Sequence, residues 1–224
     1  MTRSVVIAVD GTAASGKGTL AKQLAAHFNF AHLDSGSLYR LTALGVLRAG
    51  RDASDEETAV AAARCVDPSD AGRFDLRGDD IALAASVVAA FSRVRDALLD
   101  YQRRFAAAPP CGAGGAVIDG RDIGTVVCPD AEAKLFVDAE PKTRAHRRWL
   151  ELHAGGTGIS EASVLADIRA RDARDRNRSV APLKPAADAV LLDTTELDID
   201  AAFAAALALV RPSVEEALAV RHRG

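Results

Sequence analysis

Apolar and polar positions follow one another in short blocks that predict strands separated by helices. The run Val5–Val9 is continuous, apolar and rich in β-branched residues, which is typical of a buried strand. After it, Leu20, Leu24 and Phe28 recur every four residues and indicate one stripe of a helix. Further strand-like runs cover 31–34, 116–119, 134–137 and 190–193. The pattern therefore predicts an α/β protein with a parallel sheet of about five strands.

Helical spacing and capping residues predict helices between these strands. Ser35 is expected to cap a helix that runs to about Arg48, and Ser54–Glu57 has the spacing of a capping box for a helix that ends near Cys65. The stretch 67–80 is rich in Asp, Gly and Arg and predicts a loop or a small hairpin. Further helices are predicted over 81–105 with a break near Ser92, over 141–153 after Pro141, over 160–178 behind a cap at Ser160, and over 199–210.

Composition narrows the class of protein. The 224 residues suit one domain, and a net charge of −3 predicts no nucleic-acid or membrane partner, so any basic site must be local. Cys65, Cys111 and Cys128 are scattered, which predicts neither zinc nor disulfides and fits a reducing cytoplasm. The first apolar run has only strand length, and Ala201–Val210 is too short to span a bilayer. We expect a cytoplasmic protein, and a monomer.

The loop after the first predicted strand has the spacing G-x-x-x-x-G-K. It consists of Gly11, Thr12, Ala13, Ala14, Ser15, Gly16, Lys17, Gly18 and Thr19. Between a strand and a helix, this spacing predicts a P-loop, in which backbone N–H groups and the helix start bind a polyphosphate. Lys17 can reach its β- and γ-phosphates. Because Gly18 stands where a hydroxyl could bind Mg²⁺, we expect no metal-ligating side chain and a metal held mainly by phosphates and water.

Two further segments are expected to meet the P-loop. Asp34 and Ser35 lie at the carboxyl end of the second predicted strand, and the charged turn 119–122 lies at that of the third. Parallel strands end at the same edge of a sheet, and ligands bind outside that edge. The sequence therefore predicts one cleft built from three separate segments.

Arginines gather on the helix predicted over 160–178. Helical spacing puts Arg171, Arg174, Asp175 and Arg178 on one face, while Arg169, Asp172 and Arg176 fall on another face, where they can form ordinary surface pairs. Guanidinium groups bind phosphate oxygens in pairs and stay ionised, so the first face predicts an arginine lid. Phosphoryl transfer to an anionic acceptor needs positioning and charge stabilisation rather than a general base. The absence of a plausible catalytic His is consistent with that chemistry.

The chain resembles the bacterial cytidylate kinases of the nucleoside monophosphate kinase family over about residues 5–210. The motifs are Gly16-Lys17-Gly18-Thr19, Asp34-Ser35-Gly36-x-x-Tyr39-Arg40, Asp119-Gly120-Arg121-Asp122-x-Gly124-Thr125-Val126-Val127 and Arg171-Asp172-x-Arg174-Asp175-Arg176-Asn177-Arg178. An adenylate kinase would carry Gly-Phe-Pro-Arg in place of Gly120–Asp122. The resemblance implies a P-loop NTPase-type three-layer fold in one kinase domain. It also implies an acceptor-binding insert at 36–108, a lid at 144–180 and a tail at 212–224.

The resemblance further implies transfer of the γ-phosphoryl group of ATP to CMP or dCMP, with Mg²⁺. By similarity, the acceptor phosphate would contact Ser35, Arg40, Arg121 and Arg178. The cytosine would contact Ser86, Arg95 and Asp122, and the sugar would contact Arg171 and Asp175. The candidate catalytic residues are Lys17, Arg121, Arg174 and Arg178. Between Gly78 and Ser86 the chain is shorter than family members that carry an extra segment with an arginine there.

Other functions stay open at this stage. The chain can be another small-molecule P-loop kinase, acting on UMP, AMP or a non-nucleotide acceptor. It can also be a GTPase-like switch, although no Asn-Lys-x-Asp motif for guanine is present and the arginines lie in the same chain. A third interpretation makes the arginines a nucleic-acid patch, against which the near-neutral net charge argues.

Overall fold

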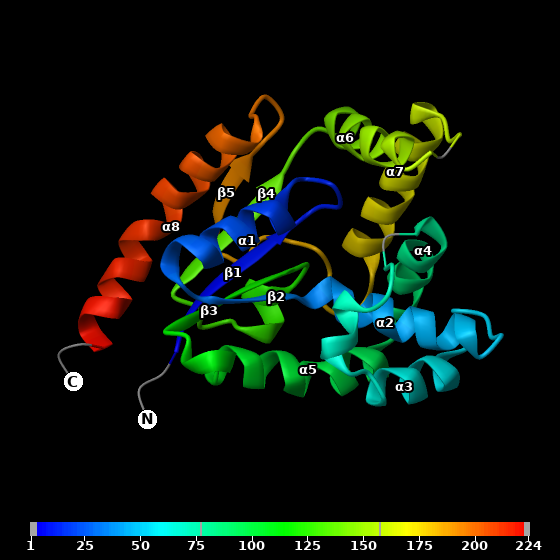
Figure 1. The fold of residues 1–224 in the computed structure, drawn as a ribbon, viewed down its shortest axis with the longest axis horizontal. Coiled ribbons are helices and arrows are strands. Elements are labelled where there is room, and N and C mark those ends of the chain that lie inside the picture. The colour runs from blue at the N-terminus through cyan, green and yellow to red at the C-terminus, as the bar shows by residue number, and fades with distance from the viewer. Residues whose placement is uncertain (1–3, 77, 157, 222–224) are drawn as a thin grey trace.

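A computed structural model describes residues 4–76, 78–156 and 158–221 (Figure 1). Within these ranges five parallel strands form one sheet in the order β2-β3-β1-β4-β5. The strands are β1 (Val5–Gly11), β2 (Ala31–Asp34), β3 (Gly115–Gly120), β4 (Ala133–Asp138) and β5 (Val190–Asp193). The predicted α/β class and parallel five-stranded sheet are confirmed.

Both faces of the central strand β1 are buried. Val5, Ile7 and Val9 pack against α1 (Lys17–Phe28) and α8 (Ile199–Arg221) in one apolar cluster. Val6 and Ala8 belong to a second cluster, on the other face, with residues of α5 (Ser92–Ala107) and of the short turn η3 (Ile123–Val127). The ribbon shows the sheet between these layers (Figure 1). A strand covered on both sides needs an unbroken apolar run, which is why its sequence shows no alternation.

Two helical units extend from this core on the same side of the molecule (Figure 1). Between β2 and β3, α5 joins α2 (Ser35–Arg48), α3 (Glu56–Arg64) and α4 (Asp79–Val88) around an apolar cluster of its own. Between β4 and β5, α6 (Pro141–Ala154) and α7 (Glu161–Asn177) pack as a helical hairpin around Ala145, Val164 and Ile168. Helix α4 of the first unit touches α7 of the second. The two units therefore face each other beyond the end of the sheet.

Two predicted helix starts were wrong by one residue. Asp34, rather than Ser35, caps α2 and accepts the backbone N–H three residues on at 3.2 Å. Asp55, rather than Ser54, caps α3 in the same way at 3.1 Å. In each pair the carboxylate accepts the bond, which makes the bond charge-assisted. Ser35 instead donates its hydroxyl to the carbonyl of Asp119 at 2.8 Å.

The remaining boundaries agree with the sequence apart from the last helix. The cap at Ser160 and the break before Ser92 are confirmed. The stretch 67–80 forms a 3₁₀ turn, η1 (Pro68–Gly72), and no strand among its described residues, so the loop alternative was right. Of the predicted units, residue 77 of the insert, residue 157 of the lid and residues 222–224 of the tail lie outside the described residues.

Helix α8 continues through Pro212 to Arg221, although the sequence predicted its end at Val210. A proline inside a helix removes one backbone hydrogen bond. Val210 and Val214, on either side of it, are buried against the sheet, and this burial offsets the lost bond. In the described part of the chain, no helix combines the length and the apolar character that crossing a bilayer requires.

A buried carboxylate joins β1 to the turn after β3. Asp10 accepts the backbone N–H groups of Ile123 and Gly124, each at 2.7 Å. These bonds fix η3, which directly follows Arg121 and Asp122. Burial raises the pKa of Asp10 to about 6, and the two N–H bonds offset only part of that rise. The central strand thus holds the turn that carries predicted site residues.

Replacing Gly11 with Ala should destabilise the fold, because the new Cβ would lie 2.0 Å from the carbonyl oxygen of Val137. We expect Gly11→Ala to lower the free energy of unfolding by about 3 kcal/mol, measured by urea denaturation. Gly50→Ala is the matched control, since Gly50 also has a positive φ but no atom lies within 4 Å of its added Cβ. That control should cost only about 1 kcal/mol from backbone strain. Equal losses would contradict the steric argument.

Asp10 should make stability fall as the pH rises through its folded pKa. The folded pKa, about 6, lies above the ordinary value of 3.8, so between these values the folded state binds more protons than the unfolded state. Each pKa unit corresponds to about 1.4 kcal/mol, and at pH 4 the unfolded carboxyl is already partly ionised, so the unfolding free energy of the wild type minus that of Asp10→Asn should fall by about 2 kcal/mol from pH 4 to pH 7. Urea melts across this range measure it, and a flat difference would refute the role of burial.

Candidate functional site

The predicted P-loop ends on the N-terminus of α1. Gly16 caps this helix with φ 85°, and its carbonyl accepts the N–H groups of Thr19 and Leu20. On the other side of the loop, Thr12 donates its hydroxyl to Asp138 at 2.6 Å. Gly16 has no capping side chain, so the first backbone N–H groups of α1 are left for a ligand. Helix N-termini with open N–H groups attract anions, as the P-loop prediction requires.

A cleft of about 570 Å³, including its open mouth, lies beside the P-loop. It is lined by Lys17 and by every predicted substrate residue: Ser35, Arg40, Ser86, Arg95, Arg121, Asp122, Arg171, Asp175 and Arg178. These side chains come from α1, α2, α4, α5, the turn after β3, and α7. Arg174 is the predicted catalytic residue outside this lining; it is half-buried on α7. The convergence of separate segments on one cleft therefore holds, and it takes in the insert as well.

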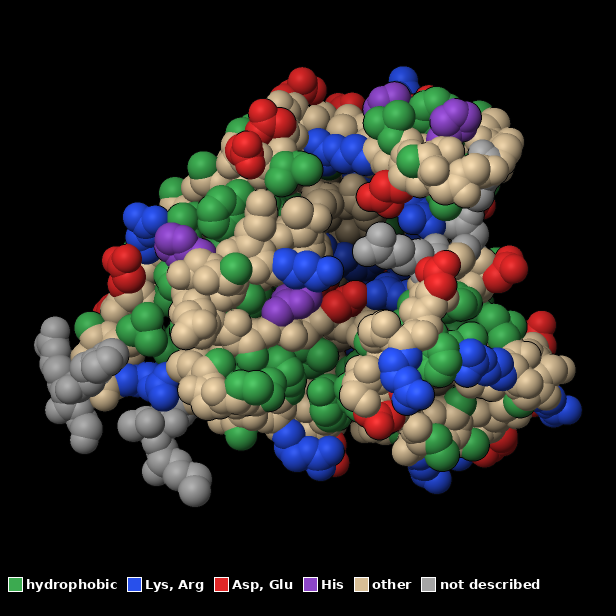
Figure 2. Space-filling view, viewed as in Figure 1, with side chains coloured by type: hydrophobic (Ala, Val, Ile, Leu, Met, Phe, Trp, Pro, Cys, Tyr) green, Lys and Arg blue, Asp and Glu red, His purple; other side chains and the backbone are tan. Residues whose placement is uncertain are grey.

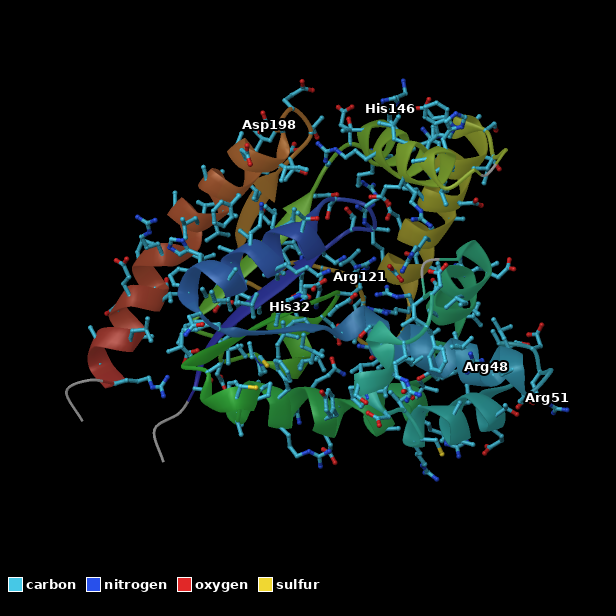
Figure 3. The ribbon with its side chains drawn as sticks, viewed as in Figure 1. His32, Arg48, Arg51, Arg121, His146 and Asp198 are labelled. Carbon is cyan, nitrogen blue, oxygen red and sulfur yellow. The ribbon has the colours of Figure 1, made fainter. Side chains whose placement is uncertain are left out.

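Ion pairs cross the cleft and join its segments. The Nε–H of Arg121, after β3, donates to Asp175 on α7 at 3.0 Å. Arg95 on α5 pairs with Asp122, whereas Arg40 on α2 forms a local pair with Asp34, the cap of its own helix. Arg121 lies centrally, between the end of the sheet and α7 (Figure 3). Asp175 thus pairs with a residue from another element, and the i,i+4 pair with Arg171 that a solvated helix would form is not the one found.

Positive charge is concentrated in this cleft. Six basic and four acidic side chains line it, although the chain as a whole carries −3. Lys and Arg side chains are visible in the hollow at the centre of the molecule (Figure 2). Burial, and then the charge of Arg121, lower the pKa of Lys17 to about 8 and that of Arg171 to about 10. A bound anion would stabilise the charged forms of Lys17 and Arg171 and raise both pKa values again, so the cleft favours anionic ligands.

Two acidic residues of the cleft, Asp34 and Asp175, have pKa values below the ordinary value and stay ionised at neutral pH. Burial raises the pKa of Asp175, but the charges of Arg121, Arg171 and Arg178 outweigh it, and the net pKa lies below the ordinary value. Burial acts on Asp34 in the same direction, and Arg40 and Lys17 likewise lower its pKa overall. Both carboxylates can therefore accept hydrogen bonds or neutralise arginines, but neither is suited to act as a proton donor.

Three polar atoms in the cleft are buried without a hydrogen-bond partner among the described residues. They are Ser86 Oγ, Arg171 Nε and Arg178 Nη2. Buried polar groups in folded proteins are nearly always paired, and exceptions point to a ligand, ion or water. The three atoms sit on α4, on α7 and at its end. Polar partners of a ligand are thus expected from both helical units.

Sequence reasoning assigned no role to several side chains at the site. Tyr39 lies in the cleft, and the guanidinium of Arg95 is 5.5 Å from its ring centre. Asp119 also lines the cleft, and its carboxylate is 2.9 Å from His32 Nε2. Both stand in motifs that the resemblance quotes, and Asp119 ends a strand at the ligand-binding edge. That position was a signal of function, whereas the pairing with His32 depends on the fold.

The sequence predicted Asp172 at the surface, because of the helical face on which it lies, but this prediction was wrong. Asp172 is buried and pairs with Arg144 of α6, with its Oδ2 2.6 Å from Nη2. Arg176, from the same helical face, pairs with Asp138 at 3.7 Å.

Across the described ranges, no three His, Cys, Asp or Glu side chains are placed together to hold a metal ion.

Comparisons with known proteins show which family this sequence is similar to. The family model for cytidylate kinase matches residues 7–212. The cytidylate kinase of Methylocella silvestris is 56% identical over 218 residues, covering 97% of this chain and 99% of its own. That of Nitrobacter winogradskyi is 57% identical over 206 residues, covering 92% and 95%. A solved structure from Chloroflexus aurantiacus shares the fold, with a TM-score of 0.52, 16% identity, and coverage of 97% and 99%. The P-loop, the arginine-lined cleft and this similarity along nearly the whole length agree, and the chain belongs to the cytidylate kinase family.

Proposed function

We propose that this protein transfers the γ-phosphoryl group of ATP to CMP or dCMP, giving ADP and CDP or dCDP. The observation that carries the proposal is the cleft in which Lys17 of the P-loop lies with arginines of the β3 turn and of α7. Family membership supports the nature of the donor and the acceptor. Two nucleotides bound tail to tail bring several negative charges together, and the positive surplus of the cleft matches them.

The acceptor phosphate would lie among Ser35, Arg40, Arg121 and Arg178. Guanidinium forks hold phosphate oxygens in pairs, and the orphan Nη2 of Arg178 is one donor ready for them. Lys17 reaches toward the donor phosphates, while Arg121 and Arg178 offset the charge that spreads over the moving group. Arg174 would join them when the lid closes. The acceptor phosphate is already anionic, so no protein base is required.

The cytosine would be read by Ser86, Arg95 and Asp122. Cytosine presents an exocyclic amine donor beside two acceptors, and one carboxylate with two donors complements this set. The guanidinium of Arg95 is held by Asp122 and lies over the ring of Tyr39, so it needs little rearrangement. The unpaired hydroxyl of Ser86 supplies the remaining donor. A base that lacks the matching groups would leave buried polar atoms unpaired and would bind less well.

Mg²⁺ would be held mainly by the nucleotide phosphates and by water. Glycine at 18 offers no hydroxyl to the ion, and the Oδ1 of Asp119, 3.7 Å from where a Cβ on Gly18 would lie, would supply negative charge on this side of the loop. When bound, the ion neutralises phosphate charge. We further propose a cytoplasmic monomer in which 36–108 form the acceptor-binding insert and 144–180 form a lid that excludes water.

An acceptor panel tests this proposal. When ATP is the donor, CMP and dCMP should be phosphorylated efficiently, and UMP and AMP should react more slowly, as measured by coupled ADP release.

Lys17→Ala should lower kcat about a hundredfold or more, since it removes a cation from the developing charge. Its circular dichroism melt should match the wild type, because the loop backbone is held by other contacts. Preference for UMP or AMP, or full activity of the variant, would contradict the assignment.

Asp175 offers a separate test of the acceptor side. Asp175→Ala removes a buried acceptor that holds Arg121 and is proposed to hold the sugar with Arg171. We expect kcat/KM for CMP to fall about tenfold to a hundredfold, as for a charged hydrogen bond, while KM for ATP stays within about threefold. Asp167→Ala, at an exposed position of the same helix, is the matched control. Equal losses for the two substrates would count against this role.

A further inference from the structure

The carbonyl groups of the P-loop are held by side-chain donors, two of which come from outside the loop. Ser15 donates its hydroxyl to the carbonyl of Thr12 at 3.0 Å, and Thr194, before α8, donates to the carbonyl of Ser15 at 3.0 Å. Arg144 of α6 donates from Nη1 to the carbonyl of Ala13 at 3.1 Å. The N–H and C=O of one peptide unit point in opposite directions. A donor that holds the carbonyl on the outer side therefore also fixes where the neighbouring N–H points.

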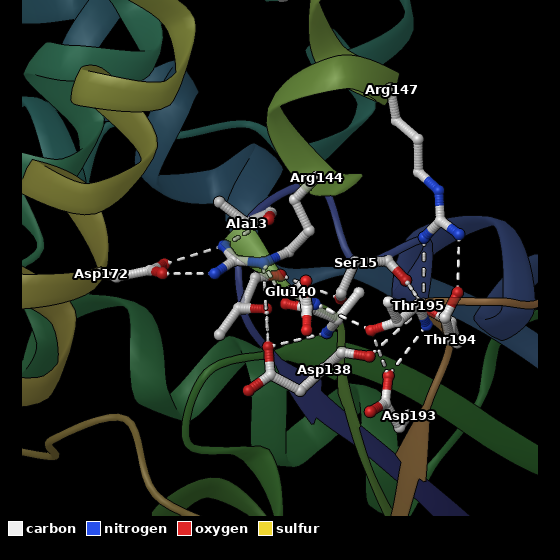
Figure 4. Close-up of polar contacts among 12 residues, drawn as sticks. Ala13, Ser15, Asp138, Glu140, Arg144, Arg147, Asp172, Asp193, Thr194 and Thr195 are labelled. Carbon is white, nitrogen blue, oxygen red and sulfur yellow. Dashed lines mark hydrogen bonds and ion pairs between the residues drawn. The ribbon is translucent and has the colours of Figure 1, made fainter. Parts of the chain in front are cut away.

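Arg144 is the largest side chain of this set, and it is almost fully buried. It is 1% exposed, and its Nε also donates to the carbonyl of Ala139 at 2.7 Å. Its two terminal nitrogens bind both oxygens of Asp172, at 3.2 and 2.6 Å (Figure 4). Asp172 is itself 5% exposed. A guanidinium fork can bind a carboxylate and two carbonyls at once, which an ammonium group cannot do in the same geometry.

The partner of Arg144 belongs to the helix that carries the acceptor-side arginines. Asp172 on α7 directly follows Arg171, and Asp175 comes one turn later. Arg171 and Asp175 both line the cleft. One side chain of α6 thus joins the carbonyl of Ala13 to the Asp172 carboxylate on α7. Two arginines of α7 differ from Arg144: Arg169 is exposed, and Arg176 is exposed and pairs with Asp138 at 3.7 Å.

An apolar contact reinforces this link. Ala14, at the tip of the P-loop, packs against the cluster of Ala145, Val164 and Ile168 between α6 and α7. Its φ is +58°, a left-handed conformation that non-glycine residues adopt only when their surroundings impose it. The loop tip is therefore seated on the hairpin by a methyl group next to the peptide that Arg144 holds.

We propose that Arg144 and Asp172 are positioning residues, which fix the P-loop peptides and α7 relative to each other so that donor and acceptor phosphates meet. This proposal rests on the proposed kinase function. Neither side chain needs to touch a substrate. A displacement of about 1 Å in a reacting group can cost about a hundredfold in rate, so a link of this kind is worth testing by kinetics as well as by stability.

The decisive variant is Arg144→Met/Asp172→Leu. Removing one partner alone leaves a buried, unpaired charge, whereas replacing both with apolar residues is tolerated in many proteins. We expect the double variant to keep its circular dichroism spectrum and melting midpoint but to lose about a hundredfold in kcat. Its affinity for ADP, measured without any acceptor, should fall about tenfold or more, because the loop N–H groups are no longer aimed. Arg169→Met/Asp167→Leu makes the same changes at exposed positions of α7 and should behave as the wild type.

Arg144→Lys keeps the charge beside Asp172 but loses the fork, and it provides the readout if the double variant does not fold. It should fold and lose about tenfold in kcat, since the carbonyl of Ala13 loses its donor. ADP binding can be followed by the fluorescence of Trp149, the chain's one tryptophan, which lies on α6 and donates to the carbonyl of Ile159 at 3.1 Å.

These measurements separate the two proposals. If CMP is not an acceptor, the kinase proposal fails, while ADP binding still reports on the link. A folded double variant, or a folded Arg144→Lys, with wild-type ADP affinity and wild-type kcat would reduce the pair to an ordinary ion pair and overturn the inference. In a cycle of Arg144→Lys, Asp172→Asn and their double variant, residues that act as one unit should give losses in kcat that do not multiply. Multiplying losses would equally overturn it.

Discussion

Mutual repulsion between cations is the constraint under which this site is built. Six basic side chains share one cleft in a chain of net charge −3, and burial makes their charges harder to sustain. The structure meets the difficulty with acidic partners from other segments: Asp122 for Arg95 and Asp175 for Arg121. Each such pair also ties two elements together. Charge compensation and the shape of the cleft therefore have the same cause.

The compensation is incomplete, and that is what gives the cleft its preference. The lowered pKa values of Lys17 and Arg171 mean that their charged forms are held at a cost which a phosphate would remove. The same cost discourages binding of neutral ligands, because they would bury the cations without pairing them. Orphan polar atoms on Ser86 and Arg178 act in the same direction. The protein is complementary to a polyanionic, polar ligand rather than to an apolar one.

Local patterns sufficed for the features that depend on neighbours along the chain. The strands, the P-loop spacing, the cap at Ser160 and the face shared by Arg171, Asp175 and Arg178 could all be predicted, because strand and helix periods are set by the backbone. The sequence could not predict that Asp34, rather than Ser35, caps α2, because the hydroxyl of Ser35 binds the carbonyl of Asp119, which is far away in sequence. The burial of Asp172 escaped prediction for the same reason: its partner lies on another helix.

The order of the strands bears on how the nascent chain folds. β1 lies at the centre of the sheet, and its Val5 pairs with Gly115 of β3, so this strand stays without either neighbour until β3, more than 100 residues further along the chain, has been synthesised. The helices between β2 and β3 have an apolar cluster of their own, formed by residues such as Leu38, Val60, Val88 and Leu98. They can therefore condense on their own while β1 waits. In that order of events, the half of the cleft that would read the base takes shape before the sheet that supports the phosphates.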